Sequence, residues 1–143
     1  MKISQISIFL ENKKGRLYEV ATLLGKNNIN IRALTIAESK DFGVLKVVVD
    51  KTQEATALLK KHGFVNRITD IVAVEVDDKP GGLARILKAL LEADINVEYM
   101  YGFVEQNSDN ALLVFRFDDP DKAIQVLTKN KIKVLGKKDI VGL

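Results

Sequence analysis

The sequence contains no cysteine or tryptophan, and only one histidine and two prolines among its 143 residues. Without cysteine, disulfide bonds, thiolate nucleophiles and cysteine metal sites are excluded. A single histidine also argues against a zinc site or a hydrolase triad. No apolar run approaches the roughly 18 residues of a membrane span, and the opening MKISQISIF lacks the features of a signal peptide. These absences predict a globular protein of the cytoplasm.

What the sequence does contain is a repeated pattern. ENKKGRL at 11–17 and DDKPGGL at 77–83 each follow an alternating apolar stretch, and each opens a run with the apolar spacing of a helix face. Three later pairs of stretches match in the same order: NNINI at 27–31 with ADINV at 93–97, FGVLKVVVD at 42–50 with NALLVFRFD at 110–118, and TDIVAV at 69–74 with KDIVGL at 138–143. The chain is therefore a tandem duplication.

Each copy follows the order strand, helix, two strands, helix and a short final strand. The middle strands are joined through ESKDFG at 38–43 and EQNSDN at 105–110, which have the composition of turns, and Pro120 suits the first position of a helix. The order βαββαβ, twice, predicts an α+β fold of tandem ferredoxin-like sandwiches. Because sheet edges must be paired or protected, we expect the copies to share a continuous antiparallel sheet.

The boundary between the copies is expected within residues 68–74, which gives domains 1–69 and 70–143 without a flexible linker. Residues 1–70 carry 12 Lys and Arg against 7 Asp and Glu, a net charge of +5; residues 71–143 carry 10 against 12, a net charge of −2. The simpler interpretation is two solvated surfaces of different composition, and the alternative is a basic half that meets an acidic partner. Because most positive charges have a negative counterpart, a general nucleic-acid groove is poorly supported.

The stretch DKPGGLARILKALLEADINVEYM at 78–100 resembles an ACT domain, a small regulatory module attached to many amino-acid biosynthetic enzymes. ENKKGRLYEVATLLGKNNINIRAL at 11–34 is similar to a weaker version of it. The resemblance extends from about Ser4 to Leu143 and is to stand-alone tandem ACT proteins, which implies no catalytic domain. It further implies a non-enzymatic sensor of an amino acid or a close analogue, with no metal or cofactor. A homodimer that acts on a metabolic enzyme or another regulated protein is expected.

The resemblance also implies where the second copy binds its ligand. A glycine at the start of a helix lets backbone N–H groups approach a ligand, and the helix dipole favours an anion there. The candidate donors for a ligand carboxylate are the amides of Gly81, Gly82 and Leu83. Asp78 is the candidate acceptor for the ligand ammonium group. Asn96, expected beside the turn as it enters the next strand, can both donate and accept.

The first copy has a matching but altered set of positions. These are Asn12, Gly15, Arg16, Leu17 and Asn30. Lys14 stands where Pro80 stabilises the second turn, and Arg16 stands where Gly82 allows close approach. The arginine could pair with a ligand carboxylate or simply fill the pocket. The first copy is therefore the weaker candidate for ligand binding.

Each of these residues also has a purely structural interpretation. The glycines could form a tight strand-to-helix turn without a ligand, and the asparagines could bond their own backbone. Tyr99 and Tyr101 are expected on one strand face with Val97 and Phe103, a pattern typical of core packing.

Catalytic groups are scarce. His62 precedes Gly63 at the expected end of a helix, where it complements the helix C-terminus. Four aspartates could in principle bind magnesium, although they also fit as solvated turns and caps: Asp77, Asp78, Asp118 and Asp119. Neither glycine turn continues as a P-loop. Arg16 in a glycine turn faintly resembles the arrangement of small enzymes that bind acyl phosphates on this fold.

The main alternative to a sensor is an RNA-binding protein, because RNA-recognition modules share the βαββαβ order. IFLEN at 8–12 and KDFGVLKV at 40–47 resemble the two strand motifs of that family. However, Val44 and Val47 stand where stacking aromatic residues belong, and bases need aromatic faces for stacking. The sensor is therefore the preferred hypothesis.

Overall fold

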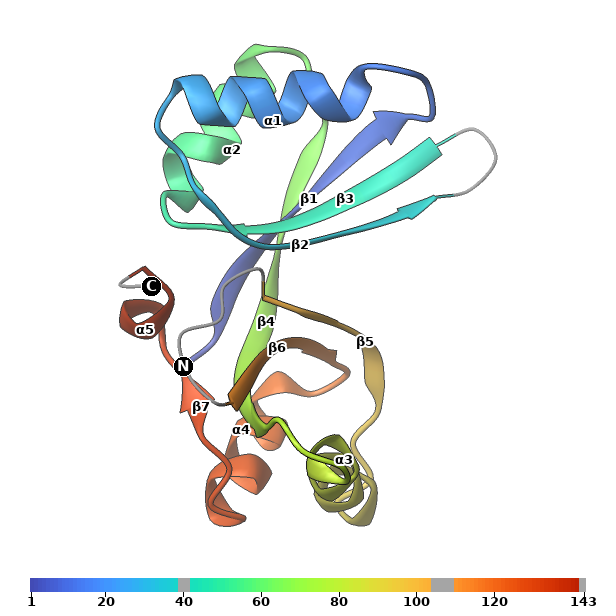
Figure 1. Cartoon of the computed structure of the whole chain (residues 1–143), viewed down its shortest axis with the longest axis vertical. Coiled ribbons are helices and arrows are strands. Elements are labelled where there is room, and N and C mark those ends of the chain that lie inside the picture. Colours follow the sequence, from blue (N-terminus) through green and yellow to red (C-terminus); the bar gives the residue numbers. More distant parts are fainter. Residues whose placement is uncertain (39–41, 104–109, 142–143) are drawn as a thin grey trace. The chain divides into compact units, whose positions relative to one another are not determined.

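A computed structural model of the chain describes residues 1–38, 42–103 and 110–141 (Figure 1). The chain forms two compact units, Ser4–Thr69 and Met1–Ile3 together with Asp70–Leu143. We call them the N-terminal unit and the C-terminal unit. The hairpin turns predicted at 38–43 and 105–110 lie largely outside the described residues.

The N-terminal unit is a sheet covered on one face by two helices, α1 and α2 (Figure 1). Hydrogen bonds connect its strands in the order β2-β3-β1-β4, and both β1 and β2 run antiparallel to β3. Its elements are β1 (Ile3–Glu11), α1 (Arg16–Lys26), β2 (Ile31–Glu38), β3 (Phe42–Val49), α2 (Thr52–Lys61) and β4 (Asn66–Asp77), which continues into the C-terminal unit.

Alternation along the strands builds the core of this unit. Ile6, Ile8 and Leu10 are every second residue of β1, and all three are buried against the helices. From α1, Val20 and Leu24 are one helical turn apart and enter the same cluster. The apolar spacing of the sequence therefore places the core where it was predicted.

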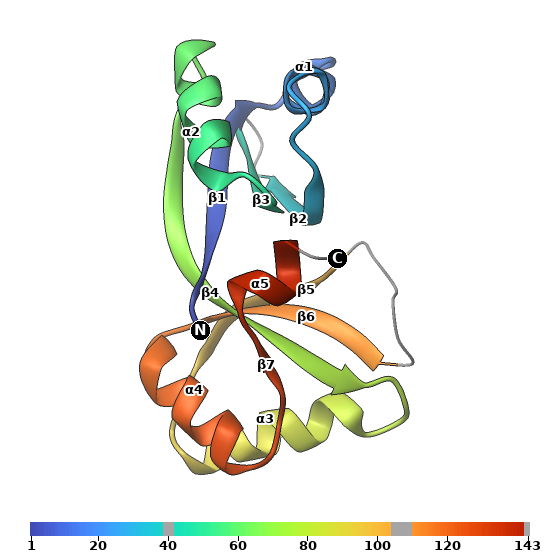
Figure 2. The same ribbon diagram turned by 90° about the vertical axis from the view of Figure 1, so that its left-hand side faces the viewer.

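The C-terminal unit repeats this arrangement, with α3 and α4 on one face of its sheet (Figure 2). Strand β6 pairs antiparallel with β4 and β5, and a short β7 pairs with β4. After β4, its elements are α3 (Gly82–Glu92), β5 (Val97–Gly102), β6 (Asn110–Phe117), α4 (Pro120–Lys129), β7 (Val134–Leu135) and α5 (Lys137–Val141). In its core the rings of Phe115 and Phe117 stack with centroids 5.3 Å apart.

One predicted element is wrong. KDIVGL was expected to form the closing strand of the second copy, but residues 137–141 form helix α5, and the closing strand is the two-residue β7. The backbone N–H of Gly136 donates to the Asp139 carboxylate at 2.8 Å, and the N–H of Asp139 donates to the carbonyl of Gly136 at 3.1 Å. The side chain of Asp139 thus stabilises the first turn of this helix.

The predicted α+β fold of two ferredoxin-like units with antiparallel strands is confirmed. Pro120 is the first residue of α4, as predicted, and the Asp119 side chain accepts a hydrogen bond from the N–H of Lys122 at 3.1 Å. The predicted continuous sheet depends on the placement of the two units relative to one another and stays a prediction. In the part of the chain that the structure describes, no helix is both long and apolar enough to cross a membrane.

Candidate functional site

The two glycine turns are built in the same way. Gly15 and Gly81 are the residues before α1 and α3, and their φ angles of 88° and 87° lie in the left-handed region that favours glycine. In the second turn the N–H of Lys79 donates to the carbonyl of Asp77 at 2.9 Å, and in the first turn the N–H of Lys13 makes the matching bond to Glu11. The predicted duplication of the turn therefore extends to its hydrogen bonds.

The start of each helix leaves backbone donors open. The first intrahelical bonds run from Arg85 to Gly81 and from Glu19 to Gly15. No side chain caps either helix, and among the described residues no group accepts from the amides in the remaining positions of the first turn, which are Leu17, Tyr18, Leu83 and Ala84. Both helix starts can therefore offer two N–H groups to an anion.

Gly82 has a different role from the predicted one. Its N–H already donates to the carbonyl of Lys79 at 3.0 Å, so this amide is not open to a ligand. A Cβ atom at this position would lie 2.1 Å from the carbonyl oxygen of Asp77. Gly82 thus permits close approach of the protein's own backbone, and Gly81 and Leu83 remain the candidates in this turn.

Arg16, at the position that matches Gly82, does not cover the first helix start. Its guanidinium group donates to the Glu19 carboxylate at 2.8 Å and lies 5.1 Å from the centroid of the Phe64 ring. These contacts hold the side chain along α1 and toward the end of α2. Its own amide donates to the carbonyl of Lys13 at 3.4 Å, which leaves Gly15 and Leu17 as the candidates in this turn.

The asparagines lie far from the turns of their own unit, so the expected place of Asn96 beside the turn is wrong. Asp77 pairs with Asn110 at one end of β6, whereas Val97, which follows Asn96, pairs with Phe117 at the other end. Seven steps of about 3.3 Å separate these ends, roughly 23 Å. In the N-terminal unit, Asn30 and the first turn are likewise at opposite ends of β3.

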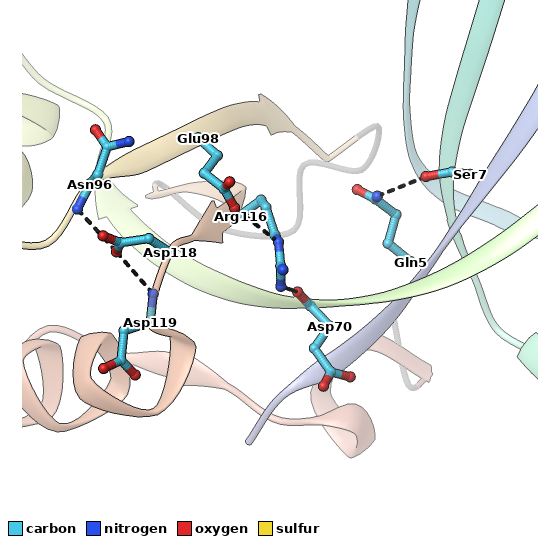
Figure 3. Close-up of polar contacts among 8 residues, drawn as sticks. All are labelled: Gln5, Ser7, Asp70, Asn96, Glu98, Arg116, Asp118 and Asp119. Carbon is cyan, nitrogen blue, oxygen red and sulfur yellow. Dashed lines mark hydrogen bonds and ion pairs between the residues drawn. The ribbon is translucent and has the colours of Figure 1, made fainter.

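Each asparagine is held by an aspartate that the sequence analysis did not assign to it. The N–H of Asn96 donates to the Asp118 carboxylate at 3.2 Å, and Asp118 also accepts from the N–H of Asp119 (Figure 3). The N–H of Asn30 donates to Asp50 in the same way, at 2.9 Å. The signal was present in the sequence, because Asp50 and Asp118 occupy matching positions of the repeat.

The remaining predicted acceptors are exposed. Asp78 follows β4 directly in the second turn, and its carboxylate has no partner among the described residues. Asn12 is exposed at the matching position of the first turn. Asp78 is thus free to accept from a ligand ammonium group.

The tyrosines of β5 are not on the predicted face. A bulge between Val97 and Tyr99 changes the alternation, so that Val97 and Met100 pack against the core while Tyr99 and Tyr101 pair with Arg116 and Val114 on the opposite face. The two phenol rings stack with centroids 6.4 Å apart. Burial, with a smaller contribution from Tyr99, raises the pKa of the Tyr101 phenol above its ordinary value.

An ion pair lies beside the bulge on this face. The Arg116 guanidinium contacts the Glu98 carboxylate at 3.2 Å and donates to the carbonyl of Asp70 at 2.8 Å (Figure 3). These three residues join β4, β5 and β6 within the C-terminal unit. The sequence analysis missed this cluster because the bulge that places Glu98 leaves no local signal.

Other predicted chemistry is not assembled by the fold. The aspartates considered for magnesium are separated, because Asp77 and Asp118 lie at opposite ends of β6, and no group of three potential metal ligands occurs in residues 1–38, 42–103 and 110–141. His62 is the C-cap residue of α2, next to Gly63, as predicted. Val47, proposed as a position for base stacking, is buried against the helices and cannot face a nucleic acid.

Comparison with known families gives one match over the whole chain. Residues 1–143 match the family described as ACT domain pair. The chain belongs to the ACT domain pair family. Its two glycine turns and two asparagines therefore occupy equivalent places in the two ACT domains of one chain.

Solved structures show the same architecture. The ACT domain pair is 42% identical to protein BT0572 from Bacteroides thetaiotaomicron, with a TM-score of 0.94 over 100% of this chain and 98% of that one. The ligand-free regulatory subunit of aspartate kinase from Thermus thermophilus is 16% identical, with a TM-score of 0.63 over 88% and 91% of the two chains. Aspartate kinase from Clostridium acetobutylicum is also 16% identical, with a TM-score of 0.52 over 90% of this chain and 33% of that one. A search among curated proteins gives no match.

Proposed function

We propose that this ACT domain pair is a non-enzymatic sensor that binds an amino acid, or a close analogue, and passes the signal to a partner protein. The observation that carries the proposal is the pair of open helix starts, each with two backbone N–H groups that have no acceptor in the described part of the chain. A carboxylate is the natural ligand for such a start. The free Asp78 carboxylate next to the second start complements an ammonium group.

The separation of the turns from the asparagines determines what form the site takes. A free amino acid is too short to contact both the second turn and Asn96 of one unit, because they lie at opposite ends of β6, which is roughly 23 Å long. A ligand held by a turn and an asparagine must therefore receive them from two different ACT domains. The proposed site is accordingly a joint between ACT units of one chain or of two chains in a homodimer.

A joint between two domains also supplies a mechanism. A ligand that contacts both domains stabilises the orientation in which both contacts form, and only such a difference in affinity between states can transmit a signal. With one carboxylate and one ammonium group paired, we expect a dissociation constant between micromolar and millimolar, or about −8 to −4 kcal/mol. The regulated partner is a metabolic enzyme or another cytoplasmic protein.

The proposal is tested by thermal unfolding of the full chain with each of the twenty amino acids. One or a few amino acids should raise the melting temperature, because a ligand that binds only the folded state stabilises it. Asp78→Asn should remove this shift without changing the melting temperature of the free protein. Glu92→Gln, which makes the same change of charge at the other end of α3, is the matched control and should keep the shift.

Three outcomes would count against the proposal. A flat response to all twenty amino acids would argue against a sensor of this class. A shift that persists in Asp78→Asn and in the matching Asn12→Ala would place the site elsewhere. Binding of mixed single-stranded RNA at low salt, weakened by added salt, would favour the RNA-binding alternative.

A further inference from the structure

In the N-terminal unit, strand β4 has an open edge beside helix α2 (Figure 2). The strand order places β1 on one side of β4. Strand β6 pairs with β4 only from Val72 onward, and β7 pairs with it only at Ala73 and Val74. In the described part of the chain, residues 66–69 of β4 therefore have β1 as their only neighbouring strand. An unpaired edge of this kind is a template for another extended segment.

The backbone at the start of this edge points away from β1. The N–H of Phe9, in β1, donates to the carbonyl of Val65 at 2.9 Å. In a trans peptide group the N–H points opposite to the carbonyl, so the N–H of Asn66 is directed away from β1. No acceptor for this N–H is found among the described residues, and the alternation of a strand gives the N–H of Ile68 the same direction. The edge thus offers two N–H donors with the spacing of a strand ladder.

A groove lies between this edge and α2. Its volume is about 590 Å³, within the range of ligand sites. The amide group of Asn66 donates to the carbonyls of Phe64 at 3.2 Å and Thr56 at 3.5 Å, which holds the start of β4 against α2. The groove is lined by four residues of α2 and by the segment that leads into β4: Gln53, Thr56, Ala57, Lys60 and residues 63–66.

The C-terminal unit protects the matching edge. Lys133 stands at the position of Val65, and its carbonyl accepts from the N–H of Glu75 at 3.0 Å, as that of Val65 accepts from Phe9. The strand that follows, β7, has only two residues before α5. A lysine and a short strand both discourage pairing with another chain, whereas Val65 is 68% exposed. The open edge is therefore particular to the N-terminal unit and is not a consequence of the fold.

The charges along this edge are positive. Among the described residues that line the groove, Lys60 alone is charged, and Arg67 is exposed on the strand itself. Neither forms an ion pair within residues 1–38, 42–103 and 110–141. Residues directly opposite one another in a ladder point to the same face, so a side chain paired with Arg67 lies beside its guanidinium group. Side chains paired with Asn66 and Ile68 lie on the face of α2, where Ile68 is 42% exposed.

We propose that this edge binds an extended segment of another protein, which adds to β4 as a further strand. The segment pairs its backbone with Asn66 and Ile68, places apolar side chains on the face of α2, and places an acidic side chain beside Arg67. In strand addition, backbone hydrogen bonds supply affinity and alternate side chains supply specificity. The surface contains no residue of the glycine turns and neither Asn30 nor Asn96, so this proposal and the amino-acid sensor can fail independently.

The probe is the acetylated and amidated peptide Thr-Val-Glu-Val-Thr, titrated into the full chain and followed by amide NMR. We expect saturable shifts at the amides of residues 63–69, with a dissociation constant on the order of millimolar. N-methylation of the two valines removes the N–H groups that face β4, and should raise the dissociation constant by about tenfold or more. N-methylation of the glutamate is the matched control, because its N–H faces away from β4, and it should leave the constant unchanged.

Substitutions in the protein test the acidic preference. Arg67→Gln should raise the dissociation constant of the glutamate peptide about threefold, and should not change that of the peptide Thr-Val-Gln-Val-Thr. Lys61→Gln removes the same charge from α2 outside the groove, and should leave both constants unchanged. Asp78→Asn should also leave them unchanged, which separates this surface from the amino-acid site.

Three results would overturn the proposal. Equal affinity for the peptides methylated on valine and on glutamate would mean that no strand is added to β4. Shifts that do not saturate and are spread over both units would mean that the peptide has no specific site. Release of the peptide as the protein concentration rises, with a doubled mass in sedimentation, would assign the edge to a second copy of this chain.

Discussion

The two units share a topology but place their aromatic residues differently. The C-terminal unit has Phe115 and Phe117 on its central strand β6, where the N-terminal unit has Val47 and Val49 on β3. The N-terminal unit instead has Phe64 in its core, after α2, at the position that Ile132 occupies in the other unit. The comparison teaches that the fold tolerates a redistribution of core volume, because shape and patterning are conserved while individual positions change.

The strongest test of this comparison removes the aromatic ring from the strand. Phe115 is fully buried and stacks on Phe117, so Phe115→Ala should lower the free energy of unfolding by about 3–5 kcal/mol. Val47→Ala, at the matching position, should cost about 2 kcal/mol because it removes fewer buried carbons. Urea unfolding, with hydrogen exchange of the β6 and β3 amides, measures both. Equal losses would mean that the ring is not the main contributor to the C-terminal core.

A second test concerns the two glycine turns. Gly82→Ala places a Cβ atom against the Asp77 carbonyl oxygen, and the backbone must move, at a cost of about 1–3 kcal/mol. The matching position already carries a side chain, so Arg16→Ala loses only the contacts with Glu19 and Phe64, about 1 kcal/mol. Urea unfolding again measures the difference. A larger loss for Arg16→Ala would show that the turns are not packed in the way their matching hydrogen bonds indicate.

Helices and strands were predicted correctly from the sequence where the signal is local. The prediction failed where pairing with another strand decides whether a segment forms a strand. TDIVAV at 69–74 and KDIVGL at 138–143 are nearly the same letters, yet the first lies in strand β4 and the second begins in helix α5. In β4 the residues from Val72 onward are paired with β6, whereas Asp139 bonds its side chain to the start of its own helix. Local propensity is weak compared with such contacts.

The same distinction between local signals and strand pairing explains which features of the candidate site could be predicted. The open helix starts were predictable, because glycine with positive φ before an apolar helix is a local feature. The predicted position of Asn96 was wrong, because α3 runs back along the sheet. Strand β5 therefore begins at the end of the sheet that is remote from the turn. The bulge that displaces Tyr99 depends on the register with β6, which no property of the β5 sequence specifies.

The smallest expected difference concerns the aspartates that hold the asparagines. Asp118 accepts from two backbone N–H groups, those of Asn96 and Asp119, whereas Asp50 accepts from the N–H of Asn30. Asp118→Ala should therefore lower the free energy of unfolding by about 1 kcal/mol, and Asp50→Ala by somewhat less.

Asparagine substitutions at these two positions separate the hydrogen bond from the charge. Asn keeps an oxygen acceptor of the same length, so Asp118→Asn should recover most of the stability lost in Asp118→Ala. If it does not, the negative charge at the start of α4 is what stabilises this corner, and the effect should then weaken with added salt. Under the proposed sensor function, Asp118→Ala should also weaken the amino-acid response, because Asn96 is no longer fixed in position, while Asp118→Asn should preserve it. A response equally strong in both variants would indicate that Asn96 does not contact the ligand.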